Sequence, residues 1–226
     1  MRLKLPRRSV IVNIHGIGTP ARELDPGEDV AWISVPQFEM VLEAATGRED
    51  VRLTFDDGNA SDVEIALPRL LERGLRAEFY PAAGLLGDPG RLDKDGVREL
   101  HRAGMTIGSH GWAHRDWRRL TADQIHEEFV EAPKFLGDLI GVPVTRASIP
   151  FGSYDRHVLR RLRDARADRA YTSDGGRARE GSWLQPRNSL RSSLDAEWIR
   201  RVMHSPPSLP RRARQVAART VKRLRG

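Results

Sequence analysis

The 226-residue sequence contains no cysteine, which excludes disulfides and thiolate metal ligands. It also has no run that approaches the roughly 18 apolar residues of a transmembrane helix. Residues 1–8 carry several basic side chains, but no apolar segment of roughly 7 to 15 residues follows them. We therefore expect no secretory signal peptide and a cytoplasmic protein, although the lack of cysteine alone does not fix the compartment.

Acidic residues are missing from the C-terminal end, and this accounts for the whole net charge of +7. Residues 211–226 hold seven cations and no acid; subtracting these seven from the 38 basic residues leaves 31 against 31 acidic residues. Because the rest of the chain is balanced, a general nucleic-acid surface is not supported, and we expect no nucleic-acid partner. We divide the chain into a catalytic domain over residues 1–205 and a basic tail over residues 206–226.

The tail has apolar residues at a spacing that a helix would bring near one face: Ala213, Val216, Ala217, Val221 and Leu224. Such a helix favours a weak contact with an anionic membrane surface, which would place the protein at the inner membrane face. A frayed, solvated terminus is the alternative.

Short β-branched segments alternate with amphipathic segments along most of the chain. We expect strands over residues 9–14, 51–55, 75–80, 105–108, 142–149, 169–173 and 183–190. We expect helices over residues 36–45, 62–73, 95–103, 121–140, 154–167 and 195–204, and a long loop over 16–35. Strands alternating with helices predict a parallel α/β sheet, open or closed into a barrel, with the active site at the C-terminal strand ends.

Two aspartates and two histidines follow predicted strands, in TFDDG (residues 54–58) and SHGWAH (residues 109–114). Imidazoles and a carboxylate are zinc ligands, and three protein ligands leave an open position of the catalytic type. We therefore expect Asp57, His110 and His114 to bind a divalent metal, with Asp56 as general base. Zinc suits this set, with cobalt, nickel, iron and manganese as alternatives. Each motif alone also fits a plain Asx-turn or a polar loop.

Together with IPFGSYD at residues 149–155, these motifs in this order resemble the polysaccharide deacetylase family (NodB homology, carbohydrate esterase family 4). The resemblance covers about residues 9–190. It implies a distorted (β/α)7 barrel and hydrolysis of an N-acetyl group on an amino sugar. It assigns Asp56 as base, and Asp57, His110 and His114 as ligands. The backbone N–H of Phe151 would stabilise the oxyanion, and a donor of that kind is worth about 2.7–4 kcal/mol. We expect substrate contacts from Trp112, Pro150, Gly152 and Tyr154.

The sequence departs from the family pattern at two positions. Ser148 stands where the third motif often has an arginine that orients the base, and Arg146 is out of register by two. Arg187, in the last predicted strand, is our candidate for that role, and a solvated arginine is the alternative. The family's late histidine has no match after residue 190. We expect His15, at the end of the first strand, to be the general acid, as in circularly permuted branches of the family; a loop histidine is the alternative.

The sequence thus predicts a metal-dependent deacetylase acting on a nucleotide-linked or lipid-linked amino sugar, or on a precursor of a surface exopolysaccharide. A hydrolase of another C–N amide bond, such as a formyl amide or a cyclic imide, is the second hypothesis, based on the missing motif arginine. A catalytically silent glycan- or membrane-binding module is the third, although such a module has no need of a free base beside metal ligands. The oligomeric state stays open.

Overall fold

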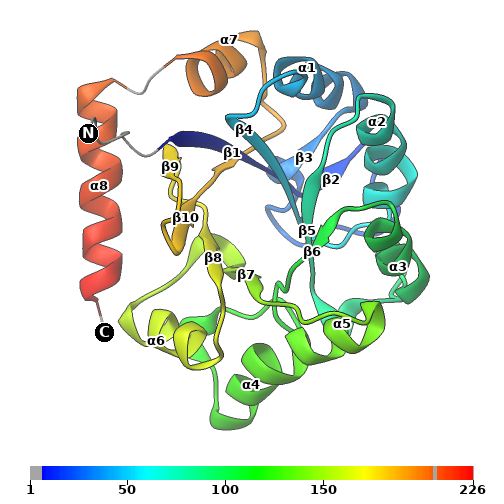
Figure 1. The fold of residues 1–226 in the computed structure, drawn as a ribbon, viewed down its shortest axis with the longest axis vertical. Helices are drawn as coiled ribbons and strands as arrows, with labels where there is room; N and C mark the ends of the chain where they lie inside the picture. Colours follow the sequence, from blue (N-terminus) through cyan, green and yellow to red (C-terminus); the bar gives the residue numbers. More distant parts are fainter. Residues whose placement is uncertain (1–6, 206–207, 226) are drawn as a thin grey trace, which may run out of the picture.

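The computed structural model describes residues 7–205 and 208–225. Figure 1 shows strands around a central axis, with helices on the outside. One sheet has the strand order β11-β1-β4-β5-β6, with β9 paired to β1, and the other has the order β10-β8-β7. Their bounds are β1 (Arg8–Ile14), β4 (Val51–Asp57), β5 (Ala77–Pro81), β6 (Thr106–Ile107), β7 (Arg146–Ser148), β8 (Arg169–Thr172), β9 (Arg177–Arg179), β10 (Leu184–Pro186) and β11 (Asn188–Ser189).

Two links join these sheets into a ring. A parallel bridge between Ser109 and Ala147 connects the end of β6 to β7. On the other side, β10 pairs with β8, and β11 pairs with β1, with only Arg187 between β10 and β11. The strands therefore form the predicted distorted seven-stranded α/β barrel, in which β10 and β11 are two halves of one strand. Every pairing named here is parallel except that of β9 with β1.

The helices follow the strands as predicted and cover the barrel from outside (Figure 1). They are α1 (Val35–Ala45), α2 (Leu67–Glu72), α3 (Lys94–Arg102), α4 (Ala122–His126), α5 (Ala132–Ile140), α6 (Arg156–Asp164), α7 (Ala196–Ile199) and α8 (Leu209–Leu224). A capping box formed by Thr121 and Gln124 begins α4, as expected. The predicted helices 62–73 and 121–140 each contain a π-helical turn just before a proline, whose missing N–H removes one regular helical bond.

The main apolar core lies between the β1-β4-β5 side of the barrel and the first three helices. Phe55 of β4 stacks on Phe79 of β5, with ring centroids 4.5 Å apart, and meets Phe38 of α1 edge-on at 6.1 Å. Buried aromatic pairs of this kind add about 0.5–1.5 kcal/mol beyond the area that they bury. This packing fixes β4, and therefore the two aspartates at its end.

Three segments differ from the prediction. The expected loop 16–35 contains the short parallel pair β2 (Gly16–Ile17) and β3 (Trp32–Ile33). Gly16 allows this pairing because a Cβ there would lie 2.3 Å from the Trp32 ring. Strand β9 was not predicted, and the expected strand 142–149 is shortened to β7.

The tail forms α8, which packs beside α6. The predicted domain boundary between residues 205 and 206 falls next to residues 206–207, which lie outside the described residues. Across the described ranges 7–205 and 208–225, no helix combines the length and the apolar character that crossing a bilayer requires.

Candidate active site

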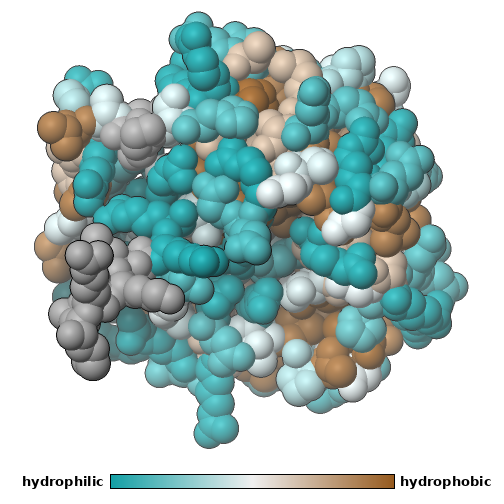
Figure 2. Space-filling model, turned by 45° about the horizontal axis from the view of Figure 1, so that its top comes forward, coloured by the Kyte–Doolittle hydropathy of each residue, from teal (hydrophilic) through white to brown (hydrophobic). Residues whose placement is uncertain are grey.

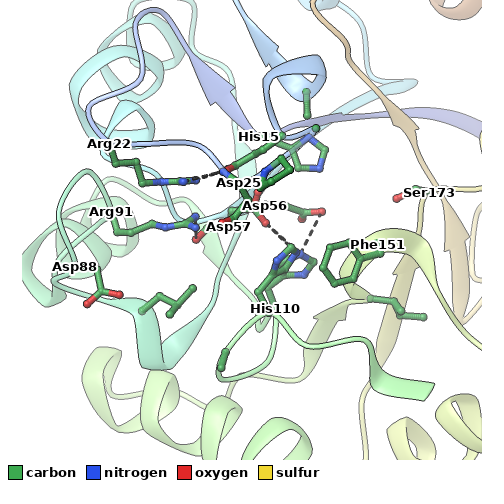
Figure 3. A pocket seen from close by; sticks show the side chains of 18 of the residues that line it. His15, Arg22, Asp25, Asp56, Asp57, Asp88, Arg91, His110, Phe151 and Ser173 are labelled. Carbon is green, nitrogen blue, oxygen red and sulfur yellow. Dashed lines mark hydrogen bonds and ion pairs between the residues drawn. The ribbon is translucent and has the colours of Figure 1, made fainter. Parts of the chain in front are cut away.

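A cavity of about 730 Å³ opens at the C-terminal ends of the strands (Figure 3). Its walls include residues that are far apart in the sequence but end up on one face of the barrel. Among them are His15 after β1, Asp56 and Asp57 at the end of β4, His110 and His114 after β6, and Phe151 after β7. The convergence expected from a parallel fold is therefore present.

Asp57, His110 and His114 point at a common centre. Asp57 Oδ1 lies 3.3 Å from His110 Nε2 and 3.4 Å from His114 Nε2, and the three ligand atoms lie within 4.8 Å of one another. The other ring nitrogen of His110, Nδ1, donates to the Ser148 carbonyl at 2.8 Å, so in the neutral ring the lone pair is on Nε2. Asp57 Oδ1 is buried and has no hydrogen-bond partner among the described residues. This donor set fits a divalent cation.

The electrostatics of the centre agree with that fit. Burial lowers the pKa of His114 to about 4, so its ring is neutral at pH 7, the form that binds metals. Burial also acts to lower the pKa of His110, but Asp56 and Asp57 outweigh it and raise that pKa. The two carboxylates therefore favour positive charge at this point of the site.

The backbone is strained where it delivers these side chains. Asp57 has φ +76°, His114 has φ +51° and Phe151 has φ +57°, all in the left-handed region that non-glycine residues rarely adopt. The turn at Asp57, continued by Gly58 with φ +69°, brings two successive carboxylates into the same cavity. On a continuing strand they would point to opposite faces. Strain of this kind costs about 1–3 kcal/mol per residue and gathers at functional sites.

Asp56 is held by a buried clamp. Arg187 donates from Nη1 to Oδ1 at 2.8 Å and from Nη2 to Oδ2 at 2.6 Å, while Asn13 and Ser148 donate to Oδ2 at 2.9 and 3.0 Å. Burial acts to raise the pKa of Asp56, but the charges of Arg187 and His110 lower it to about 2. Asp56 is therefore ionised at neutral pH and fixed in orientation.

Ser148, at the position of the missing motif arginine, contacts both Arg187 and Asp56. Arg187 is fully buried, and its Nη2 donates to Ser148 Oγ at 2.7 Å while its Nη1 donates to Asn13 Oδ1 at 2.8 Å. Arg146, by contrast, donates to Glu78 at the opposite end of the barrel. The roles of Asn13 and Ser148 were not predicted. A signal existed for Asn13, a polar residue within the otherwise apolar strand that precedes His15.

His15 lines the same cavity as Asp56 and Asp57 (Figure 3). Its Nε2 lies 3.4 Å from Asn13 Nδ2, and its carbonyl accepts from Asn59 Nδ2 at 3.2 Å. Its Nδ1 is buried and has no partner within the part of the chain that the structure describes. The ring therefore lies next to Asn13, which also donates to Asp56.

Phe151 occupies a tight turn after β7. The N–H groups of Gly152 and Ser153 donate to Ile149 and Pro150 within this turn, both at 3.1 Å, which leaves the Phe151 N–H outside the turn's own bonds. The Phe151 side chain is 65% exposed, and its ring centroid lies 4.4 Å from that of His114. The turn thus places an aromatic ring beside His114 and leaves a backbone N–H outside the turn's own bonds.

Four residues expected to contact substrate are not brought to the cavity. Trp112 packs on Gly84, where a Cβ would lie 2.3 Å from its ring, and meets Phe135 edge-on at 5.7 Å. Tyr154 is buried and donates to Asp174 at 2.7 Å. Pro150 and Gly152 are buried on either side of Phe151 in the sequence. None of the four lines the cavity, and their contact with substrate stays a prediction.

Charged residues that the sequence did not single out form the other wall of the cavity: Arg22, Asp25, Glu28, Asp88 and Arg91. Arg22 is paired with Glu28, and Arg91 Nη1 lies 3.4 Å from the Asp57 carbonyl oxygen. The first three come from the segment between β2 and β3, so this segment closes one side of the site. Its Gly- and Pro-rich composition indicated a loop but not where the loop lies.

The chain resembles known proteins in sequence. A family model for polysaccharide deacetylase matches residues 43–170, more than half of the chain. YxkH of Bacillus subtilis is 24% identical over 143 residues, which cover 63% of this chain and 51% of YxkH. Peptidoglycan-N-acetylglucosamine deacetylase PgdA of Listeria monocytogenes is 26% identical over 132 residues, covering 58% of this chain and 26% of PgdA. The chain thus spans about half or less of the length of these relatives.

Solved structures share the fold. The deacetylase PplD of Streptococcus pyogenes, solved with acetate, has a TM-score of 0.76 at 18% identity, covering 88% of this chain and 100% of that one. A de-N-acetylase from Aggregatibacter actinomycetemcomitans has a TM-score of 0.73 at 16% identity, covering 86% and 99%. With the sequence match over residues 43–170, the chain belongs to the polysaccharide deacetylase family.

Proposed function

We propose that this protein is a metal-dependent hydrolase that removes N-acetyl groups from an amino sugar or a polysaccharide precursor. The observation that carries the proposal is the meeting of two groups in one cavity. Asp57, His110 and His114 converge on a common centre, and Asp56, held ionised by Arg187, lies beside them. This is the arrangement that activating a water against an amide carbonyl requires.

Asp57, His110 and His114 would hold the cation, with zinc as the first choice. A divalent cation bound there supplies Lewis acidity, which polarises a carbonyl and makes water a stronger acid. Asp56 is placed to accept the proton of the attacking water, because it is ionised and its orientation is fixed by four donated hydrogen bonds. Arg187 is a positioning residue, since it acts through Asp56.

The remaining groups act on the carbonyl and on the leaving amine. The Phe151 N–H donates to the oxygen that gains negative charge, and His15 gives a proton to the nitrogen as the C–N bond breaks. Water and the acetamide are thereby converted into acetate and a free amine. The cavity volume lies within the range of about 300–1,000 Å³ that is typical of small-ligand sites, so it accommodates an amino sugar.

A substrate panel tests this proposal. Purified, metal-loaded protein is incubated with N-acetylglucosamine oligomers, UDP-N-acetylglucosamine and a lipid-linked analogue, and released acetate is measured with and without a chelator. We expect chelator-sensitive release from at least one of these substrates. An inactive Asp56→Asn variant serves as the control for contaminating esterases.

Two outcomes would contradict the proposal and point elsewhere. Tight binding of one metal without acetate release would favour another C–N amide as the substrate. The absence of both acetate release and bound metal would favour a glycan- or membrane-binding module.

A further inference from the structure

Helix α8 docks on the barrel through its polar side. Gln215, Arg219 and Lys222 are its half-buried residues among those described, and their spacing of four and three places them on one face. Arg219 donates to the Gly175 carbonyl at 2.6 Å, and Lys222 donates to Asp174 at 2.7 Å and to the Gly152 carbonyl at 3.0 Å. These contacts tie α8 to the turn that carries Phe151.

The opposite side of α8 is apolar and faces solvent. Leu209 is 79% exposed, Leu224 is 74%, Val221 is 64% and Val216 is 53%. At 3.6 residues per turn, Ala213, Ala217 and Leu224 lie opposite the docked polar residues. The left edge of Figure 2, over α8, shows brown apolar side chains beside teal ones. A helix at a protein surface normally has the reverse orientation, with the apolar stripe against the core.

Arginines border this apolar stripe on both sides. Within residues 208–225, the exposed arginines with described side chains are Arg212, Arg214, Arg223 and Arg225, and none of them makes an ion pair within the described part of the chain. The sequence of residues 208–225 contains no acidic residue. An outward apolar stripe flanked by cations needs a partner that is both anionic and apolar.

We infer that α8 lies on the surface of an anionic phospholipid bilayer. Its apolar stripe would lie at the boundary between headgroups and acyl chains, and its arginines would contact the phosphates. A second copy of this chain fits less well, because it would bring two cationic helices together. A nucleic acid would use the arginines but leave the apolar stripe exposed. This inference does not rest on the proposed hydrolase activity, since the surface is defined without any residue of the cavity.

Vesicle flotation with the full chain tests the inference. The probes are vesicles of phosphatidylcholine alone and of phosphatidylcholine with about one third phosphatidylglycerol, at about 0.15 M salt and at about 1 M salt. We expect binding to the anionic vesicles only, and its loss at high salt, where the screening length falls to about 3 Å. A combined Val221→Ser and Leu224→Ser variant should bind at least about tenfold more weakly.

The matched control is Leu71→Ser with Val142→Ser, which removes two exposed apolar side chains outside α8 and should bind like the wild type. Melting curves monitored by circular dichroism verify that both variants stay folded. The inference is overturned by equal binding of the Val221→Ser and Leu224→Ser variant and the wild type, or by equal binding to neutral vesicles. Dimerisation without vesicle binding, or tighter binding to a DNA duplex than to vesicles, would also replace it.

Discussion

Two buried carboxylates lie at opposite ends of the barrel, and neighbouring arginines stabilise the ionised form of each. Near the N-terminal strand ends, Glu78 pairs with Arg52 and Arg146 and accepts from Tyr80 and Tyr171 at 2.7 and 2.8 Å. Near the C-terminal ends, Asp56 pairs with Arg187. Burial acts to raise both pKa values, and the neighbouring cations outweigh it, so each pKa lies at about 2.

The two ends differ in what surrounds the carboxylate. Both oxygens of Glu78 have partners, and its neighbours do not include strained backbone. Beside Asp56, Asp57 Oδ1 and His15 Nδ1 are buried without partners among the described residues, and Asp57 has positive φ. Because a buried unsatisfied group costs about 1–3 kcal/mol, it is retained where a ligand or a reaction uses it. A buried cluster whose polar atoms all have partners therefore indicates a stabilising role. A buried cluster with unpartnered polar atoms indicates a binding or catalytic role.

The largest expected effect is the loss of a ligand. His114→Ala should abolish metal binding and reduce acetate release to background, because two donors no longer hold the cation tightly. Its melting temperature without metal should stay near that of the wild type. Metal content by mass spectrometry and acetate release are measured on the same preparation. Full activity in a metal-free variant would remove the ligand assignment.

Asp56→Asn should separate the base from the ligands. The amide keeps its size and much of the hydrogen bonding but cannot take a proton, so turnover should fall toward the upper end of the roughly 10²–10⁴-fold range for general base catalysis. Metal stoichiometry should be unchanged. Turnover near the wild-type value would show that another group accepts the proton.

His15→Gln should have a smaller effect, nearer the lower end of the roughly 10²–10⁴-fold range for general acid catalysis. Glutamine fills similar space but cannot protonate the leaving amine. The loss should shrink with an activated amide whose leaving amine is less basic. If natural and activated substrates lose the same factor, His15 has only a structural role.

Arg187→Met should change the pKa and the orientation of Asp56 while leaving its carboxylate in place. Losing the guanidinium raises the pKa of Asp56 from about 2, so the acidic limb of the pH–rate profile should move to higher pH. Arg187→Lys restores the charge but not the bidentate geometry. Its acidic limb should lie between those of the wild type and Arg187→Met. An acidic limb at the wild-type position in Arg187→Met would contradict the clamp.

Glu78→Gln should leave turnover unchanged and affect only stability. We expect a loss of about 1–3 kcal/mol in the free energy of unfolding, less than for a fully buried pair because Arg52 and Arg146 are partly exposed. The folded pKa is depressed, so the wild-type stabilisation is present above the ordinary value of 4.5 and is lost as pH falls toward about 2. Denaturant titrations across that range should show that the stability of the variant lacks this pH dependence. A loss of turnover in the variant would show that Glu78 also contributes to the reaction.

Much of the site follows from the sequence because parallel strands align their C-terminal ends. The positions of Asp56, Asp57, His110 and His114 required only the order of strands and motifs. Arg187 was our candidate for orienting the base, with a solvated arginine as the alternative, because sequence alone did not show that it is buried against Ser148. The packing of Trp112 against Gly84, which is distant in the sequence, could not be predicted from the spacing of the motif.

The C-terminal tail shows the same limit of sequence analysis. Its periodicity predicted an apolar face, and α8 has one. Which face docks on the barrel depends on Asp174 and on the carbonyls of Gly152 and Gly175, which accept hydrogen bonds from Lys222 and Arg219. Periodicity along one helix carries no information about acceptors that other segments supply.

The central claim is that Asp57, with its unpartnered Oδ1, belongs to a metal site that works with Asp56. A reversible chelation experiment tests this claim most directly. Bound metal per chain and acetate release are followed together while a chelator is added and zinc is then returned. We predict that one metal per chain and the activity disappear together and return together. Acetate release that survives complete removal of the metal would contradict the account.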